Sequence, residues 1–473
     1  MPLPDLMPSP RRIAILGAGP GGYVAAIRAA QLGAKVTVIE NRALGGVCLN
    51  WGCIPSKALL SVVELGEKLK KAQDLGLQLS NPPTYDPPQM VARKNRVVHG
   101  LVNGIATLFK QWGVSHVQGT GRLVNDRTVR VTLADGTETS VEAGGIIIAT
   151  GSSASALPMF PVDGYDIMTS QEALEIPRIP ERLLIVGGGV EGCEFASLYA
   201  GLGSRVTIVE MMARVLPLED EEISAVIERE LKKRQVRIIA GNSVKAVEKT
   251  DEGFTAELAD GERLGCVAIL VAVGRRCNTT GIGLEEVGVK LGDMGRIEVD
   301  DRLETNVPGV YAIGDVVGKA MLAHVASAQG KVAVENLVGM PKTMNYDVVP
   351  AGIFTLPEIG RVGLTEQEIR ERGIVPNIGR FRYSALGKAH AVGDTAGWVK
   401  ILADPKTDRV LGAHLVGTHA ADLVHEAALA MQLNAKARDV ADMIHAHPTH
   451  AEALMEAFED VEGMAIHLSR KRS

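Results

Sequence analysis

The chain has 473 residues, of which 46% are hydrophobic and 52 are glycines, and its formal net charge is −6. This composition is typical of a globular protein of roughly two to four domains rather than of a disordered chain. The charge is small and no long block of Lys and Arg occurs, which argues against nucleic acid and anionic membranes as partners. We therefore expect the function to concern small molecules.

The N-terminal segment MPLPDLMPSPRR carries prolines and Asp5 where a signal peptide would carry its apolar core. No apolar run approaches the roughly 18 residues that a membrane-spanning helix requires. The sequence therefore predicts a cytoplasmic protein that does not span a membrane.

Two stretches, residues 13–40 and 184–210, share one pattern. Each predicts a short apolar strand, a G-x-G-x-x-G turn, a helix and a second strand that ends in Glu, 23 positions after the first glycine. Small residues let the backbone approach a pyrophosphate at the helix N-terminus, and the acid accepts hydrogen bonds from a ribose. We therefore expect two bound dinucleotides, held by Gly17, Gly19, Gly22 and Glu40 in the first unit and by Gly187, Gly189, Gly192 and Glu210 in the second.

Further strands are expected at IIIAT (146–150), ILVAVGR (269–275) and GVYAIGDV (309–316), and a mixture of strands and helices follows to the C-terminus. The predicted fold class is α/β, with two Rossmann-like dinucleotide-binding domains and a C-terminal α+β domain. The expected segments are 1–153, 154–277, 278–347 and 348–473.

Cys48 and Cys53 lie five positions apart in GGVCLNWGCIPSKALL (45–60). Close cysteines in a cytosolic chain are usually metal ligands or redox-active, and this segment lacks the further ligands that zinc or an iron–sulfur cluster would need. A redox disulfide is the favoured interpretation, and two unpaired structural thiols are the alternative. The other three cysteines are expected to be unpaired thiols: Cys193, Cys266 and Cys277.

The backbone between the two cysteines cannot be a regular helix when they are bonded. Five residues of ideal helix advance about 7.5 Å, beyond the roughly 7 Å limit on the Cα separation in a disulfide. Gly52 can supply the irregular backbone, and Pro55 disfavours a helical conformation at Ile54, so we expect the following helix to begin with SKALL (56–60). Thiols near a helix start with Lys57 close by should have a stabilised thiolate.

The cysteine pair begins eight residues after Glu40, so it lies beside the first dinucleotide. Thiolate and hydride chemistry couple through a flavin, which predicts FAD in the first unit and NAD in the second. Glu210 suits a free 2′-hydroxyl and repels a 2′-phosphate, which favours NAD over NADP; Arg214 lies nearby and leaves NADP open.

The cysteine segment, the two glycine patterns, IIIATGS, VAVGRR, YAIGDV, LAH and HAHPTHAE occur in an order that resembles the pyridine nucleotide-disulfide oxidoreductases, from residue 11 to about 460. The resemblance is strongest to the members that oxidise dihydrolipoyl groups with NAD+. It implies FAD and NAD as cofactors, a homodimer formed through 348–473, and an FAD site completed by 278–347. The implied partners are lipoyl domains of 2-oxo acid dehydrogenase complexes or the H protein of the glycine cleavage system.

The resemblance also implies roles for single residues. Cys48 would meet the substrate dithiol, Cys53 would form the thiolate next to the flavin, and Lys57 would contact the flavin and pair with Glu194. Glu210 and Gly274 would bind NAD. The residues that would line FAD are Glu40, Gly119, Thr150, Gly151, Ser152, Asp315, Met321, Leu322, Ala323 and His324.

HAHPTHAE (445–452) supplies the expected acid–base group, because a thiol must lose its proton before it attacks and His titrates near working pH. Glu452 could orient the imidazole of His447, and the resemblance implies that this pair reaches the partner's cysteines across a homodimer. A metal site formed by His445, His447 and His450 is an alternative, although it lacks a fourth ligand.

The chain departs from the resembling family at three positions: it has Cys277 where Pro is common, Leu356 where His is frequent and Gln329 where Glu is usual. Other functions stay open at this point. These are reduction of a small disulfide such as glutathione with NADPH, a mercuric reductase, which would be expected to carry a C-terminal cysteine pair that this chain lacks, and a non-catalytic flavin-binding redox sensor.

Overall fold

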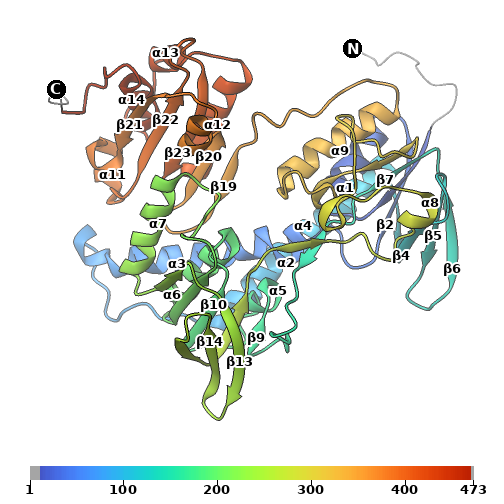
Figure 1. Cartoon of the computed structure of the whole chain (residues 1–473), viewed down its shortest axis with the longest axis horizontal. Helices are drawn as coiled ribbons and strands as arrows, with labels where there is room; N and C mark the ends of the chain where they lie inside the picture. The colour runs from blue at the N-terminus through green and yellow to red at the C-terminus, as the bar shows by residue number, and fades with distance from the viewer. Residues whose placement is uncertain (1–10, 470–473) are drawn as a thin grey trace.

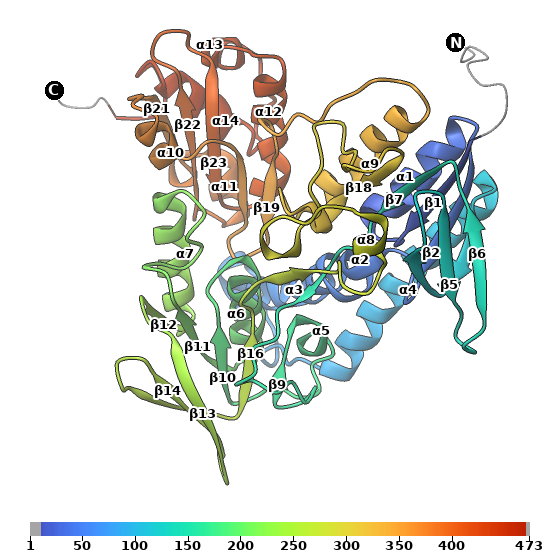
Figure 2. The same ribbon diagram turned by 45° about the vertical axis from the view of Figure 1, so that its right-hand side comes forward.

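The computed structural model describes residues 11–469 and has three lobes, shown in Figure 1 and turned by 45° in Figure 2. The second lobe is mainly green and the C-terminal lobe orange to red, whereas the first lobe combines blue and teal segments with the yellow to light-orange segment around α9. The segment MPLPDLMPSP, on which the argument against a signal peptide rests, lies outside the described residues, as do the last four residues.

The first lobe is built on a five-stranded parallel sheet with the order β18-β7-β1-β2-β3. Helix α1 (Pro20–Gln31) follows the first glycine-rich turn and packs against α9 (Ala323–Leu337), which lies beside it in Figure 1. Residues from the far end of this lobe's sequence therefore complete both its sheet and its helical layer. The strands are β1 (Arg12–Leu16), β2 (Lys35–Glu40), β3 (Ser115–Gln118), β7 (Gly145–Ile148) and β18 (Val310–Ala312).

The second lobe repeats this arrangement with a parallel sheet of order β12-β11-β10-β16-β9. Helix α6 (Val190–Leu202) follows the second glycine-rich turn, and α7 (Glu221–Lys233) leads to the edge strand. Strand residues buried on both faces explain the continuous apolar runs seen in the sequence. The strands are β9 (Ile167–Met168), β10 (Arg182–Val186), β11 (Arg205–Glu210), β12 (Arg237–Ala240) and β16 (Ala268–Val271).

The chain crosses between these two lobes twice, and the two crossings pair with each other. β8 (Ser152–Ala154) and β17 (Arg275–Cys277) form a two-stranded antiparallel ribbon. Each of these two lobes also carries a three-stranded antiparallel meander. These consist of β4 (Thr120–Leu123), β5 (Thr128–Thr132) and β6 (Glu138–Glu142), and of β13 (Val244–Thr250), β14 (Gly253–Leu258) and β15 (Arg263–Cys266).

The C-terminal lobe is an antiparallel sheet of order β19-β20-β23-β22-β21, with α12 (Ala420–Gln432) and α14 (Glu452–Asp460) packed on it. With the two parallel sheets, this lobe confirms the predicted α/β fold class with a C-terminal α+β domain. The strands are β19 (Ala351–Ile353), β20 (Ile359–Gly363), β21 (Asn377–Arg382), β22 (Trp398–Ala403) and β23 (Val410–Val416).

The cysteine segment forms two helices, α2 (Gly46–Trp51) and α3 (Cys53–Lys70), separated at Gly52. Gly52 has φ −145° and ψ −111°, so the expected irregular backbone is present. The predicted helix start at residue 56 is wrong. The helix begins at Cys53 and includes Ile54, because a proline in the first turn has no N–H that the helix needs.

By length and composition alone, Gly46–Lys70 passes as a membrane-spanning helix of 25 residues, contrary to the expectation from the sequence. Such a single candidate is weak, since the core helix of a globular domain passes the same test. Here the stretch is broken at Gly52, and α3 packs against α6 and α4 (Pro87–Trp112). This packing buries Leu59, Leu60 and Val63 of α3.

Candidate active site

The two glycine-rich turns have the same geometry. Gly17 and Gly187 adopt φ of +101° and +104°, and a Cβ on either would lie 2.3 Å from a carbonyl oxygen of the neighbouring strand's end. A Cβ on Gly22 or Gly192 would lie 1.9 Å from the carbonyl oxygen of the first glycine in its turn. Only glycine therefore allows the helix to start so close to the strand.

The middle glycines behave differently. A Cβ on Gly19 would meet no atom closer than 4.0 Å, and a Cβ on Gly189 would meet none within 4 Å. Both residues line one large cavity, so the space beside them is open for a ligand to approach the backbone. This arrangement fits a pyrophosphate at the N-terminus of each helix.

The acids at the ends of the second strands also occupy equivalent positions. Glu40 accepts hydrogen bonds from the backbone N–H groups of Ala18 (2.8 Å) and Arg42 (2.7 Å). Glu210 accepts from those of Gly188 (2.6 Å) and Met212 (2.7 Å). Each carboxylate therefore ties its glycine-rich turn to the loop after its strand while it lines the cavity.

A single cavity of about 1380 Å³ runs from the first turn to the second. Of the predicted cofactor residues, Gly22, Gly192 and His324 do not line it. Gly22 and Gly192 act in helix packing instead, and the His324 Nε2 lies 2.7 Å from the Pro350 carbonyl oxygen. The predicted residues that do line it are Gly17, Gly19, Glu40, Lys57, Gly119, Thr150, Gly151, Ser152, Gly187, Gly189, Glu194, Glu210, Gly274, Asp315, Met321, Leu322 and Ala323, together with Cys48 and Cys53.

The fit of the predicted cofactors to this cavity rests on these observations. Two turns built for close backbone approach and two ribose-type acids open into one continuous space. The cysteine pair lies in the lining between them. The donor set therefore suits two dinucleotides whose reactive ends meet near the thiols.

Cys48 and Cys53 are free thiols in this structure, and Cys53 is exposed to the cavity. A hydrogen bond from the Cys48 thiol lowers the pKa of Cys53 to about 7, although burial opposes this shift, and the Lys57 charge acts in the same direction as the bond. The same hydrogen bond raises the pKa of Cys48, and burial adds to the rise. Cys53 is therefore the thiol that ionises first.

Lys57 joins all three lobes. Its Nζ lies 2.7 Å from Glu194 Oε2 and 4.6 Å from the centre of the Phe354 ring. Glu194, on α6, also accepts a hydrogen bond of 2.9 Å from the Phe354 N–H at the start of the C-terminal lobe. The sequence analysis did not include Phe354, because its contact partners lie far away in the chain.

The two-stranded crossing forms another part of the cavity wall. Arg275 donates to the Ser152 hydroxyl (2.7 Å) and carbonyl (2.9 Å), and the Ser152 hydroxyl in turn contacts the Asp315 carboxylate. Asn278 and Thr150 also exchange two hydrogen bonds, of 3.0 and 2.7 Å. Arg275 and Asn278 were not among the predicted site residues, although Arg275 lies in the VAVGRR stretch.

His447 and Glu452 form a pair outside this cavity. His447 Nδ1 lies 2.7 Å from Glu452 Oε1, and the imidazole is 76% exposed. Burial would raise the pKa of Glu452, but the Thr449 N–H and His447 lower it below its usual value, so the carboxylate is ionised and orients the ring. Neither residue lines the cavity, so within one chain this pair and the cysteines belong to different surfaces.

The other histidines of this segment have separate partners. His445 lies 2.8 Å from Glu426, and its side chain is 3% exposed. The buried ring of His450 packs against Tyr383 and His419. Within residues 11–469, no group of three or more His, Cys, Asp and Glu side chains could hold a metal ion. The geometry therefore gives no support to the metal alternative.

Comparison with known proteins agrees with this construction. The family model of the pyridine nucleotide-disulphide oxidoreductases matches residues 11–330, and the model of their dimerisation domain matches residues 349–458. The second match assigns the C-terminal lobe as a dimerisation domain.

Relatives of known name cover nearly the whole chain. Dihydrolipoyl dehydrogenase 1, mitochondrial, from Arabidopsis thaliana is 41% identical over 96% of this chain and 91% of that protein. A dihydrolipoyl dehydrogenase from Haloferax volcanii is 41% identical over 96% of each chain. The crystal structure of LpdA from Mycobacterium tuberculosis is similar with a TM-score of 0.91 and 30% identity, over 95% of this chain and 99% of that one. The chain belongs to the pyridine nucleotide-disulphide oxidoreductases.

Proposed function

We propose that this protein is a homodimeric dihydrolipoyl dehydrogenase that oxidises dihydrolipoyl groups with NAD+. One observation carries the proposal: an asymmetric thiol pair, in which Cys53 has a lowered and Cys48 a raised pKa, lies in a cavity shared by two dinucleotide-type turns. The similarity to dihydrolipoyl dehydrogenases over 96% of the chain supports the choice of substrate.

FAD and NAD(H) are the cofactors of this family, and the chain holds a turn and an acid for each. The first turn and Glu40 would hold FAD, with Ser152 and Asp315 in the wall beside it, and the second turn and Glu210 would hold NAD. Bound FAD supplies a two-electron carrier between the thiols and the nicotinamide.

The dithiol step uses the asymmetry of the cysteines. In the oxidised enzyme, a substrate thiolate attacks the Cys48 sulfur, the Cys48–Cys53 bond breaks, and Cys53 leaves as a thiolate that its low pKa and Lys57 stabilise. The second substrate thiolate then displaces Cys48 from the mixed disulfide. The products are the substrate disulfide and two reduced cysteines, so two electrons reach the enzyme.

Both substrate thiols must lose protons, and the exposed His447 is suited to take one because Glu452 orients its ring. The displaced Cys48, whose pKa is raised, takes the other. In one chain the pair does not line the cysteine cavity. We propose that the dimerisation domain of each chain brings its His447 to the cysteines of the partner. The active site is then complete only in the dimer.

The proposed partners are the lipoyl domains of 2-oxo acid dehydrogenase complexes or the H protein of the glycine cleavage system. The names of similar proteins support a lipoyl substrate. The expected cytoplasmic location stays a prediction; the names of the plant relatives place those proteins in mitochondria.

The test is to mix the purified holoenzyme with dihydrolipoamide and either NAD+ or NADP+ and to follow the absorbance of the reduced nicotinamide. Rapid formation of NADH with little NADPH is expected. No turnover with dihydrolipoamide, combined with reduction of glutathione disulfide by NADPH, would replace the proposal by a small-disulfide reductase. No turnover with any dithiol or disulfide would favour the redox sensor.

A further inference from the structure

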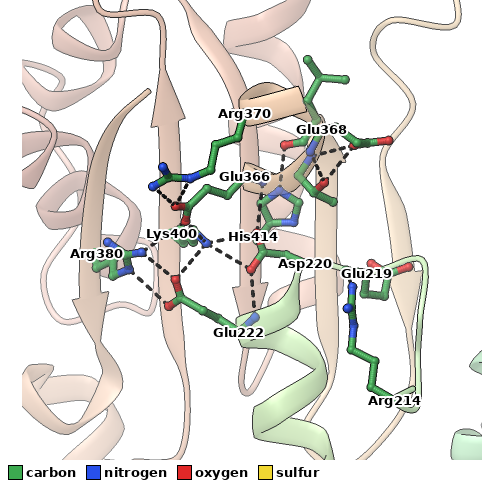
Figure 3. Close-up of polar contacts among 12 residues, drawn as sticks. Arg214, Glu219, Asp220, Glu222, Glu366, Glu368, Arg370, Arg380, Lys400 and His414 are labelled. Atoms are coloured by element: carbon green, nitrogen blue, oxygen red, sulfur yellow. Dashed lines mark hydrogen bonds and ion pairs between the residues drawn. The ribbon is translucent and has the colours of Figure 1, made fainter. Parts of the chain in front are cut away.

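A buried cluster of charges joins the second lobe to the dimerisation domain (Figure 3). Lys400 of β22 is 1% exposed, and its Nζ lies 3.0 Å from Asp220 Oδ2, 2.9 Å from Glu222 Oε1 and 2.7 Å from Glu366 Oε2. Asp220 is fully buried, and Arg380 of β21 holds Glu222 at 2.6 Å. Two of these carboxylates come from the second lobe, and both cations come from the dimerisation domain.

A second ion pair crosses the same boundary beside this cluster. The Arg361 Nε, on β20, donates to Glu219 Oε1 at 3.0 Å, and the Glu219 side chain is 3% exposed. Glu219 and Asp220 are adjacent in sequence, immediately before α7, and Asp220 accepts the N-cap hydrogen bond from the Glu222 N–H. Lys400 and Arg361 therefore hold the same short piece of chain from β22 and β20, the two strands on either side of β23.

This piece of chain is the end of the loop at residues 211–220, which begins at the predicted NAD acid. Glu210 and Met211 line the cavity at the start of the loop. In its middle, the Leu216 N–H donates to the carbonyl of Gly188, within the second glycine-rich turn, at 2.8 Å. The loop thus connects Lys400 and Arg361 of the dimerisation domain with the two elements expected to bind NAD, which are Glu210 and the second glycine-rich turn.

The backbone of the loop contains an unfavourable conformation that contacts with its surroundings must maintain. Leu216 has φ +48°, a left-handed conformation that is unfavourable for a non-glycine residue and persists only where the surroundings impose it. Arg214, the residue that could have bound the 2′-phosphate of NADP, already has partners. It donates to the Pro217 and Glu219 carbonyls at 3.3 Å and pairs with Glu221 at 3.1 Å. The Arg214 guanidinium therefore stabilises the conformation of the loop.

Buried ion pairs contribute little net stability compared with apolar side chains, because both charges lose their hydration. They differ from apolar contacts in being directional, so they fix one arrangement of the groups they join. Lys400 contacts three carboxylates from two domains, and these directional contacts fix the position of the 211–220 loop relative to the dimerisation domain.

We propose that Lys400 and Arg361 are positioning residues for the NAD site. They act through Asp220 and Glu219 on the 211–220 loop, which holds the second glycine-rich turn and Glu210 in the binding arrangement. The dimerisation domain of each chain therefore shapes the NAD site of that same chain, in addition to supplying His447 to its partner. The inference rests on the proposed function for the identity of the nucleotide.

The test compares Lys400→Met and Arg361→Gln with Arg370→Gln, all as FAD-loaded dimers. Arg370 is a matched control because it pairs with Glu366 from the exposed side of the cluster at 2.6 Å and belongs to the same helix as Glu366. Three quantities are measured: the Kd of NADH by anaerobic fluorescence titration of the fully reduced enzyme, whose flavin NADH can no longer reduce, the KM and kcat for NAD+, and the rate at which dihydrolipoamide reduces the flavin without NAD+.

We expect Lys400→Met and Arg361→Gln each to raise the Kd of NADH and the KM for NAD+ about tenfold, a typical size for coupling between sites. Flavin reduction by dihydrolipoamide and kcat at saturating NAD+ should match the wild type, and Arg370→Gln should change none of these. Arg361→Lys keeps a cation beside Glu219 and should restore most of the affinity.

An unchanged Kd for NADH in a folded variant would overturn the proposal, as would an equal loss in both half-reactions, which would indicate general destabilisation. Lys400→Met leaves three carboxylates facing one another, so if it does not fold, Arg361→Gln decides. The titration with NADH needs no dithiol substrate. Failure of the wild type to oxidise dihydrolipoamide would therefore reject the proposed function while the positioning role is still tested.

Discussion

Lys57 Nζ lies 2.7 Å from Glu194 Oε2, and this ion pair stands beside the cysteine that forms the thiolate. The two charges act in opposite directions on Cys53: Lys57 lowers the pKa of its thiol, and Glu194 raises it. The pair therefore adds two opposing electrostatic effects to a pKa that the Cys48 hydrogen bond lowers most strongly.

Replacing the two partners separately should move the Cys53 titration in opposite directions. Lys57→Met is expected to raise the pKa of Cys53, and Glu194→Gln to lower it, because each change removes one of the two opposing charges. The measurement is the thiolate absorbance of the reduced enzyme as a function of pH. Shifts of the same sign in the two variants would contradict the assignment.

The hydrogen bond between the cysteines gives a second prediction. The thiolate of Cys53 should form with a midpoint near pH 7, and Cys48→Ala should move this midpoint upward because the donor is lost. Cys277→Ala is the control, since burial raises the pKa of Cys277 and its thiol donates to the Asp315 carbonyl away from the pair. The same titration reports both. An unchanged midpoint in Cys48→Ala would show that the cysteines do not share a proton.

His447→Gln should lower the rate of dihydrolipoamide oxidation by roughly 10²- to 10⁴-fold, the usual contribution of a general base. Reduction of the flavin by NADH should be unaffected, because that step moves no substrate thiol proton. The matched control is His467→Gln: His467 is also exposed and is paired with a glutamate of α14, Glu456, at 2.5 Å. Near-normal turnover of His447→Gln, or an equal loss in His467→Gln, would reject the role of His447.

The nicotinamide preference tests Glu210. The wild type should use NAD+ far better than NADP+, because the Glu210 carboxylate repels a 2′-phosphate and Arg214 is held by Glu221 and two carbonyls. Glu210→Gln should lower the ratio of kcat/KM for NAD+ to kcat/KM for NADP+, because it weakens the binding of NAD+ and removes the repulsion of the NADP+ 2′-phosphate. Equal use of the two cofactors by the wild type would show that the acid does not select between them.

Acid stability tests the cluster between the lobes. Burial would raise the pKa of Glu222, but Arg380 and Lys400 lower it to about 2. A group with a lowered folded-state pKa stabilises the fold above its unfolded pKa, here about 4.5, and loses that contribution as the pH falls toward 2. Glu222→Gln should therefore lower Tm at pH 7 and flatten its fall between pH 4.5 and 2. Glu221→Gln, whose carboxylate is 61% exposed, should follow the wild-type curve.

Much of this protein follows from the sequence alone. The turns at Gly17 and Gly187, the acids Glu40 and Glu210 and the break at Gly52 all depend on residues within about 25 positions of one another, and local backbone and strand patterns define them. The parallel sheets follow from the alternation of these strands with helices.

Other features needed the tertiary structure. The Phe354 contact with Glu194 and the separation of His447 from the cavity are set by packing between lobes. Lys57 and Glu194 are 137 positions apart, and Lys400 and Asp220 are 180 positions apart. No local periodicity connects residues at such distances. Only the folded arrangement of the lobes brings these charges together, where burial strengthens their interaction and makes their positions matter.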